Sequence, residues 1–141
     1  SSLYMQTIQE LIDNSGVSDR IKFLGHQQDV AEFMDKVDLL LVPSDEEAFG
    51  YVNIEAAASG VPVIAPKFGG ITEAVANMKS GIVVEDNAVV NYVGAIRSLI
   101  ESPGTYQSLQ TGAIQFAQDG FLASRAEKEL ERIYKRLSLL Q

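Results

Sequence analysis

Four short runs of apolar residues recur along this chain, each separated from the next by residues with helical periodicity. The runs are IKFLG at 21–25, DLLLVPS at 38–44, PVIAP at 62–66 and GIVVED at 81–86. They are largely apolar instead of alternating with polar residues, a pattern typical of strands that are covered on both faces. Because helices separate them, the connections are right-handed crossovers and the strands run parallel. The sequence therefore predicts an α/β fold: a doubly wound parallel sheet of these four strands, with Rossmann-like helices on both faces.

The predicted helices lie between and around these strands. They are expected at 3–14, 29–37, 50–59, 71–78, 88–101, 103–118 and 122–140. Asp29 is the expected N-cap of the second helix. The chain opens on a helix, whereas a doubly wound domain normally opens on a central strand. We expect residues 1–141 to form a single domain, and the family resemblance described below implies that it is a fragment of a larger protein and lacks the first strand of its fold.

Composition excludes several classes of site. The 141 residues include no cysteine, 46% of them are hydrophobic, and the formal net charge is −8. A disulfide framework or a zinc–thiolate site is therefore excluded, and the acidic charge argues against a nucleic-acid partner. No apolar run reaches the roughly 18 residues of a membrane span, and a cytoplasmic location is expected. A small anionic ligand stays compatible with this charge, because a helix N-terminus binds phosphate whatever the net charge.

The carboxyl end of the run 38–44 is the expected ligand-binding edge, because ligands of doubly wound folds bind beyond the carboxyl ends of the strands. Glu47 lies in the loop that follows, and Gly50 stands where the next helix begins, with unpaired N–H groups in its first turn. Glu55 comes eight residues after Glu47 and lies about five residues into the helix, roughly 7 Å along its axis. Ionised carboxylates only accept hydrogen bonds, and sugar hydroxyls donate them. A ligand with a sugar, a diphosphate and a ribose in series fits this order.

Simpler interpretations of the acidic residues stay open. Glu47 could only add negative charge near a helix N-terminus, and Glu55 could be a solvated surface residue. The consecutive acids Asp45, Glu46 and Glu47 could suggest a cation site. No histidine or regular ligand spacing supports such a site, so no metal is expected.

A longer string resembles a known family. LLVPSDEEAFGYVNIEAAASGVPVIAPKFGGITEAV, followed by SGIVVED, is similar to the carboxyl-terminal domain of the family 4 retaining glycosyltransferases, the glycosyl transferases group 1 family. That family's pattern has a strand ending in Pro-Ser, then Glu-x-Phe-Gly, a second glutamate eight residues after the first, Ala-x-Ala-x-Gly-x-Pro-Val and Gly-Gly-x-x-Glu. Each element occurs here in that order. The resemblance covers most of the chain and implies the carboxyl-terminal, donor-binding half of a two-domain GT-B architecture.

The resemblance implies roles for Glu47 and the residues directly after it. Glu47 would accept hydrogen bonds from hydroxyls of the donor sugar, and it is the residue assigned to catalysis. Backbone N–H groups around Ala48, Phe49 and Gly50 would contact the sugar. The leaving diphosphate would be stabilised electrostatically while the acceptor attacks the same face of the sugar, so the protein would act by positioning and charge stabilisation.

The resemblance places the nucleotide end of the donor further along the helix. Backbone N–H groups near Tyr51 and Val52 would contact the diphosphate, and Glu55 would bind the ribose hydroxyls. Gly25, with His26 beside it, would lie near the base. No tightly bound cofactor and no metal are implied, because the nucleotide diphosphate sugar is itself the substrate.

The implied activity is that of a hexosyltransferase, which moves a hexosyl group from the nucleotide diphosphate sugar to an acceptor glycan, lipid or small molecule. The acceptor would bind a missing amino-terminal domain, and the same domain would carry any peripheral association with the membrane. The isolated chain is expected to be inactive. Two alternatives stay open: half of a nucleotide-sugar epimerase, and a non-catalytic nucleotide-sugar binding module.

Overall fold

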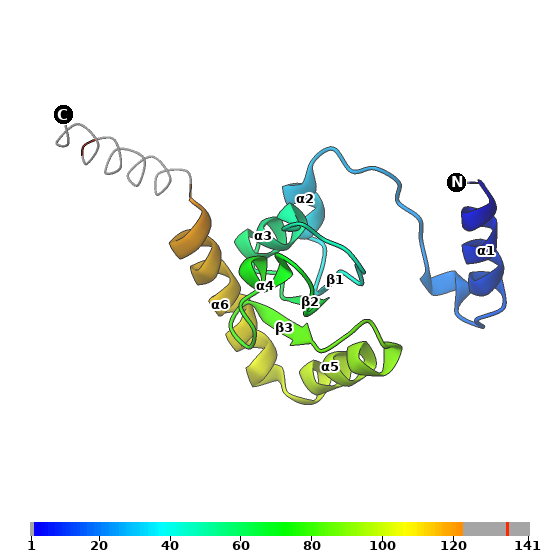
Figure 1. The fold of residues 1–141 in the computed structure, drawn as a ribbon. Helices are drawn as coiled ribbons and strands as arrows, with labels where there is room; N and C mark the ends of the chain where they lie inside the picture. Colours follow the sequence, from blue (N-terminus) through cyan, green and yellow to red (C-terminus); the bar gives the residue numbers. More distant parts are fainter. Residues whose placement is uncertain (1, 123–134, 136–141) are drawn as a thin grey trace.

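A parallel β-sheet forms the centre of the chain in the computed structural model, which describes residues 2–122 and 135 (Figure 1). The strands are β1 (Leu40–Leu41), β2 (Val63–Pro66) and β3 (Gly81–Val84). Their spatial order is β1-β2-β3, and both neighbouring pairs are parallel, with Leu40 opposite Val63 and Ile64 opposite Ile82. The α/β fold with a parallel sheet that the sequence predicts is confirmed.

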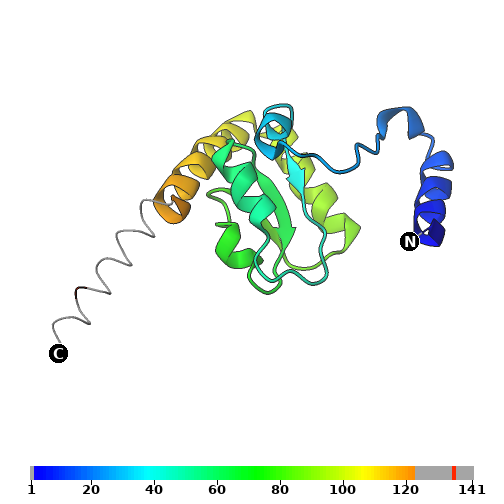
Figure 2. The same ribbon diagram turned by 90° about the horizontal axis from the view of Figure 1, so that it is seen from above.

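Helices cover both faces of this sheet (Figures 1 and 2). In chain order, the helices of the described residues are α1 (Ser2–Asp13), the short 3₁₀ helix η1 (Ser18–Arg20), α2 (Val30–Met34), α3 (Tyr51–Ala58), α4 (Ile71–Ala74), α5 (Val89–Glu101) and α6 (Pro103–Phe121). The helices α2, α3 and α4 pack on one face of the sheet, and α5 and α6 pack on the other.

The central strand β2 is buried along its whole length. Val63 and Ala65 belong to the core cluster formed with α2, α3 and α4. Ile64 points to the opposite side and belongs to the cluster formed with α5 and α6. Successive side chains of a strand point to opposite faces, so a strand covered on both faces must be apolar throughout.

Small residues bring α6 against α3. Ala57 of α3 is buried together with Ala113 and Ala117 of α6. Side chains of this size let two helices approach closely, because the interaxial distance depends on the side chains at the contact. The last turn of α6 thereby comes close to the loop that precedes α3.

The prediction of a strand at 21–25 is wrong. The structure gives this segment no regular secondary structure, and Phe23 and Leu24 are each 55% exposed. A strand satisfies its N–H and C=O groups only through a neighbouring strand, and the described sheet holds β1, β2 and β3 without this segment. Both views show α1 and this segment apart from the sheet (Figures 1 and 2). Apolar composition alone therefore does not specify a strand here.

Two other elements are shorter than the sequence predicts. Only two residues of the run 38–44 enter the ladder as β1, which pairs with β2 and is followed closely by Pro43, a residue with no N–H to donate. The helix α2 begins after Asp29, whose carboxylate accepts a hydrogen bond from the N–H of Glu32 at 2.9 Å, as expected of an N-cap. It ends at Met34, because the chain then closes in tight turns of i to i+3 bonds.

The helix expected at 71–78 ends at Ala74. The side chain of Asn77 accepts a hydrogen bond from the N–H of Val83 at 2.9 Å, so residue 77 bonds to β3 instead of continuing the helix. Asparagine side chains offer the backbone such alternatives to helical hydrogen bonds. A periodic pattern does not reveal this competition.

The bounds of the carboxyl-terminal helices agree better with the sequence prediction. The helix α5 matches the prediction for 88–101, and α6 continues to Phe121 instead of ending at 118. The helix predicted at 122–140 lies outside the described residues, apart from positions 122 and 135. Among the helices that the structure describes, none combines the length and the hydropathy that crossing a membrane requires.

Candidate functional site

Three loops meet at the carboxyl ends of the strands: 43–50 after β1, 67–70 after β2 and 85–88 after β3. A hydrogen bond joins two of them, from Asn87 Nδ2 to Asp45 Oδ1 at 2.7 Å. The hydroxyl of Tyr92 donates to Asn87 Oδ1 at 2.7 Å, so a buried tyrosine of α5 holds this connection. Burial raises the pKa of the Tyr92 hydroxyl, and the nearby charge of Asp45 raises it further.

Glu47 lies half-buried in the first of these loops. Its Cγ is 3.2 Å from the point that a Cβ on Gly50 would occupy. Gly50 is the N-cap of α3 and has a φ of +76°, in the left-handed region that favours glycine. The helix begins at Tyr51, one residue later than the predicted start at Gly50, and Phe49 lies in the loop before it. The aliphatic part of the Glu47 side chain therefore packs against Gly50, in the space that a side chain at position 50 would need.

The N-terminus of α3 opens beside Glu47. The N–H of Asn53 donates to the carbonyl of Gly50 at 2.9 Å. The N–H groups of Tyr51 and Val52 precede this bond and have no acceptor within the helix. They carry the positive end of the helix dipole. The arrangement combines a carboxylate that can accept from hydroxyls with N–H groups that can donate to an anion.

The loop after β2 supports the loop of Glu47. A Cβ on Gly69 would lie 2.6 Å from the carbonyl oxygen of Glu47, and a Cβ on Gly70 would collide with the carbonyl oxygen of Ala48. Real Cβ atoms do not approach backbone this closely, so two glycines are needed where the two loops cross. The glycine pair therefore sets the position of residues 47 and 48.

An aromatic cluster connects the same loop to the end of α6. The ring centroids of Phe49 and Phe121 are 5.8 Å apart, and those of Phe49 and Tyr51 are 5.4 Å apart. Phe121 also contacts Phe116, with 5.3 Å between ring centroids. Sequence analysis missed this contact, because the predicted helix stops at 118 and periodicity does not show which distant ring a phenylalanine meets.

Glu55 is exposed on α3 and faces a different neighbourhood from Glu47. It lines a recess together with the start of α2 and the end of α3, formed by Gln28, Asp29, Val30, Ala31, Ala58 and Ser59. Gly25 does not line this recess: it lies in the exposed segment before α2, with open space where its Cβ would be. The structure brings Glu55 next to the start of α2. The prediction that Gly25 lies near the nucleotide base stays untested.

Asn53 is a residue of this site that sequence analysis missed. It is 0% exposed, and neither Oδ1 nor Nδ2 of its side chain has a hydrogen-bond partner. Its Nδ2 lies 2.5 Å from the Cβ position of Gly50, the same point that Glu47 approaches. The available signal was one amide within the helix sequence YVNIEAAA, three residues after the glycine at its start.

Charged groups around the loops are mostly solvated. Lys67, directly after β2, lies 3.8 Å from Glu85, and the two side chains are 61% and 82% exposed. Such an exposed pair contributes little to stability. Within the described ranges, no group of three or more His, Cys, Asp and Glu residues is placed to hold a metal ion.

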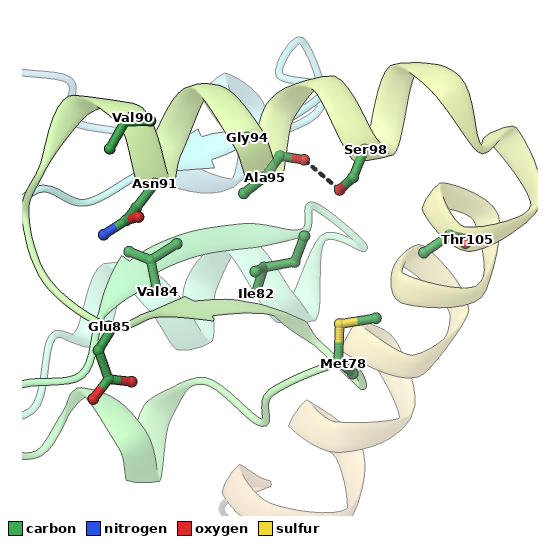
Figure 3. A pocket seen from close by; sticks show the side chains of 10 residues that line it. All are labelled: Met78, Ile82, Val84, Glu85, Val90, Asn91, Gly94, Ala95, Ser98 and Thr105. Atoms are coloured by element: carbon green, nitrogen blue, oxygen red, sulfur yellow. Dashed lines mark hydrogen bonds between the residues drawn. The ribbon is translucent and has the colours of Figure 1, made fainter.

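A separate hollow of about 400 Å³ lies between β3 and α5 (Figure 3). Ile82 and Val84 on β3 face Asn91 and Ala95 on α5, and the lining is mainly apolar. It includes none of the site residues that the sequence predicts. The loops that carry Glu47 and the N-terminus of α3 are therefore the better candidate site.

Comparison with known families identifies the class of this protein. The sequence profile of the family "Glycosyl transferases group 1" matches residues 3–116, and the chain belongs to this family. The D-inositol 3-phosphate glycosyltransferase of Corynebacterium diphtheriae is 32% identical over 133 residues, which cover 93% of this chain and 31% of that protein. The chain thus spans about a third of the length of the curated relatives it matches.

Solved structures agree with this assignment. The HepE protein of Anabaena in complex with UDP superimposes with a TM-score of 0.88 at 26% identity, covering 96% of this chain and 37% of that one. The same protein has also been solved with UDP-glucose. The C-terminal domain of the glycosyl transferase group 1 protein LpcC of Francisella tularensis has a TM-score of 0.74 at 19% identity and covers 85% of this chain and 63% of that one, which shows the fold alone. The carboxyl-terminal GT-B domain that the sequence predicts is confirmed.

Proposed function

We propose that this chain is the donor-binding domain of a retaining hexosyltransferase that uses a nucleotide diphosphate sugar. One observation carries the proposal: Glu47 and Gly50 lie at the open N-terminus of α3, on the carboxyl edge of a parallel sheet. Membership of the glycosyl transferases group 1 family supports transfer of a glycosyl group. The complexes of the Anabaena relative with UDP and UDP-glucose support this class of donor.

The sugar end of the donor is proposed to lie at Glu47. Its carboxylate accepts hydrogen bonds from the sugar hydroxyls and fixes the orientation of the transferred group, which is the sense in which Glu47 is catalytic. Backbone N–H groups around Ala48, Phe49 and Gly50 contact the same sugar. Gly50 has no side chain, so the side chains of Glu47 and Asn53 can pack against its backbone beside the proposed sugar position.

The nucleotide end is proposed to follow the helix. The N–H groups of Tyr51 and Val52, with the helix dipole behind them, stabilise the negative charge of the leaving diphosphate. Glu55 accepts from the ribose hydroxyls in the recess beside α2, and Gly25 lies towards the base. We propose that this charge stabilisation needs no bound metal or tightly bound cofactor, so addition of EDTA leaves donor affinity unchanged.

The acceptor is proposed to bind outside this chain, and the 141 residues alone are expected to show no turnover. The relatives are about three times as long as the chain, which leaves room for an acceptor-binding domain. The acceptor hydroxyl attacks the sugar on the face that the diphosphate leaves. The bond to the diphosphate oxygen breaks as the new glycosidic bond forms, and the hydroxyl proton passes to the departing diphosphate.

A ligand panel followed by product analysis tests the proposal. The melting temperature of the full-length protein is measured with UDP, GDP and ADP and with the corresponding nucleotide sugars. Ligands that bind the native state alone raise the melting temperature. We expect one nucleotide diphosphate and the corresponding nucleotide sugar to raise the melting temperature. Product analysis should then show a glycoside with the same anomeric configuration as the donor sugar. An epimerised nucleotide sugar without a glycoside would instead indicate an epimerase, and no shift with any ligand would contradict the proposal.

A further inference from the structure

Asn53 is a buried amide whose hydrogen-bonding capacity is unused. Its side chain is 0% exposed, and neither Oδ1 nor Nδ2 is bonded. Buried polar groups are nearly always paired, because an unpaired one costs the desolvation of its dipole. An apolar side chain of similar size would avoid that cost. Folding alone therefore does not account for an amide at this position.

The surroundings of Asn53 point to one partner. The three heavy atoms nearest to the Cβ position of Gly50 all belong to Asn53 and Glu47, with Nδ2 at 2.5 Å and Glu47 Cγ at 3.2 Å. The two side chains thus flank the α-carbon of Gly50. Glu47 is half-buried and makes no hydrogen bond through its carboxylate in the described structure. An amide N–H only donates and an ionised carboxylate only accepts, so the two groups are complementary.

We propose that Asn53 is a positioning residue for Glu47. In the donor-bound state, Asn53 Nδ2 donates a hydrogen bond to one carboxylate oxygen of Glu47, and the sugar hydroxyls donate to the other. The amide thereby selects the orientation in which the carboxylate receives the sugar. This inference rests on the proposed function, and it adds a residue that does not itself contact the donor.

The substitution Asn53→Leu separates this role from a structural one. In the protein as it is encoded, the melting temperature without ligand is expected to equal or exceed that of the wild type, because an unpaired buried amide is removed. The affinity for UDP stays within about twofold. The turnover number with UDP-glucose falls about tenfold, corresponding to the loss of one hydrogen bond to a charged group. If the wild type prefers another base, the corresponding diphosphate and sugar replace this pair.

The matched control is Asn91→Leu on α5. Asn91 Nδ2 donates to Asp86 Oδ1 at 2.6 Å, so this amide is paired. The control is expected to lower the melting temperature and to leave turnover and both affinities unchanged. If the leucine at position 53 proves too large for the space beside Gly50, Asn53→Ala should give the same separation of turnover from UDP affinity.

The outcomes are distinguishable. A lower melting temperature for both Asn53→Leu and Asn53→Ala, with UDP affinity falling as much as turnover, means that the amide is structural and overturns the inference. Wild-type turnover and donor affinity in Asn53→Leu also overturn it and leave the proposed function intact. A wild type that binds no nucleotide sugar overturns both.

Discussion

Asn87 and Asp45 lie 42 positions apart in sequence and are joined by a hydrogen bond of 2.7 Å at the carboxyl edge of the sheet. This bond ties the loop after β3 to the beginning of the loop that carries Glu47. The Gly69–Gly70 crossing and the contact between Phe49 and Phe121 hold the same loop at its middle and its end. The candidate site is thus positioned by three contacts between segments distant in sequence.

Removing the amide of Asn87 should destabilise the domain. Asn87→Ala deletes the bond to Asp45 and leaves the buried Tyr92 hydroxyl without its acceptor. The free energy of unfolding should fall by about 1–3 kcal/mol, measured by urea denaturation. The control is Asn14→Ala, which removes an exposed amide bonded to Glu10 in α1, and its effect should stay within about 0.5 kcal/mol. Equal effects of the two substitutions would contradict the structural role of Asn87.

Tyr92 should make stability sensitive to alkaline pH. Burial raises its pKa, and the charge of Asp45 raises it further, so the folded state holds this proton more tightly than the unfolded chain does. The resulting stability is fully present below the unfolded tyrosine pKa of about 10 and is lost as pH rises through the higher folded pKa.

We therefore expect the free energy of unfolding to decline less steeply above about pH 10 in Tyr92→Phe than in the wild type. Part of the decline should remain, because burial, followed by the charge of Asp38, also raises the pKa of Tyr106. Urea unfolding at a series of pH values measures the slope. An identical slope in the variant and the wild type would rule out this contribution of Tyr92.

Two glycine substitutions should have opposite effects. Gly70→Ala places a Cβ against the carbonyl of Ala48 and should lower the free energy of unfolding by about 1–3 kcal/mol, with weaker binding of the nucleotide sugar because the loop of Glu47 moves. Gly94→Ala, inside α5, meets nothing within 4 Å and should raise stability by up to about 1 kcal/mol. Thermal unfolding and a donor titration measure both effects. A Gly70→Ala variant that binds and unfolds like the wild type would show that the two loops do not depend on this crossing.

The end of α6 should influence the loop of Glu47 through Phe121. Phe121→Ala removes the partner of the Phe49 ring and should cost about 0.5–1.5 kcal/mol of aromatic contact, together with a severalfold loss of donor affinity. Phe121→Tyr keeps the ring and serves as the control, with values near those of the wild type. Calorimetric titration and thermal unfolding of the two variants decide between a support for the loop and an incidental contact. Unchanged donor affinity in Phe121→Ala would favour the latter.

The fold was predictable where local pattern and burial coincide. The strand β2 is apolar at every position because it is buried on both faces, and α5 shows its buried face through helical spacing. The segment 21–25 has equally apolar residues and forms no strand, because a strand also requires a partner for its backbone. The helix expected at 71–78 ends early because Asn77 bonds to β3.

The candidate site was predictable in position and not in its supports. The place of Glu47 after β1 and of Gly50 at the start of α3 followed from the strand and helix boundaries. The contacts of Gly70 with Ala48 and of Phe49 with Phe121 join distant segments, which a single sequence does not pair. The burial of Asn53 was hidden for a related reason, since most asparagines in a helix lie at the surface.

We propose that Glu47 and Glu55 bind opposite ends of one nucleotide diphosphate sugar. Neither side chain belongs to a core cluster, and Glu55 is exposed, so substitution by glutamine should leave folding intact. The melting temperatures of Glu47→Gln and Glu55→Gln without ligand check this condition. Ribose and diphosphate are common to UDP and UDP-glucose, whereas the hexose belongs to UDP-glucose alone.

The most direct measurement is calorimetric titration of the wild type, Glu47→Gln and Glu55→Gln with UDP and with UDP-glucose. Glu55→Gln should weaken both ligands about ten- to a hundredfold, because one hydrogen bond to a charged group contributes roughly 1.5–3 kcal/mol. Glu47→Gln should leave UDP affinity unchanged, weaken UDP-glucose, and lower turnover. Wild-type affinities for both ligands in both variants would contradict the account and would leave the two glutamates as solvated surface charges.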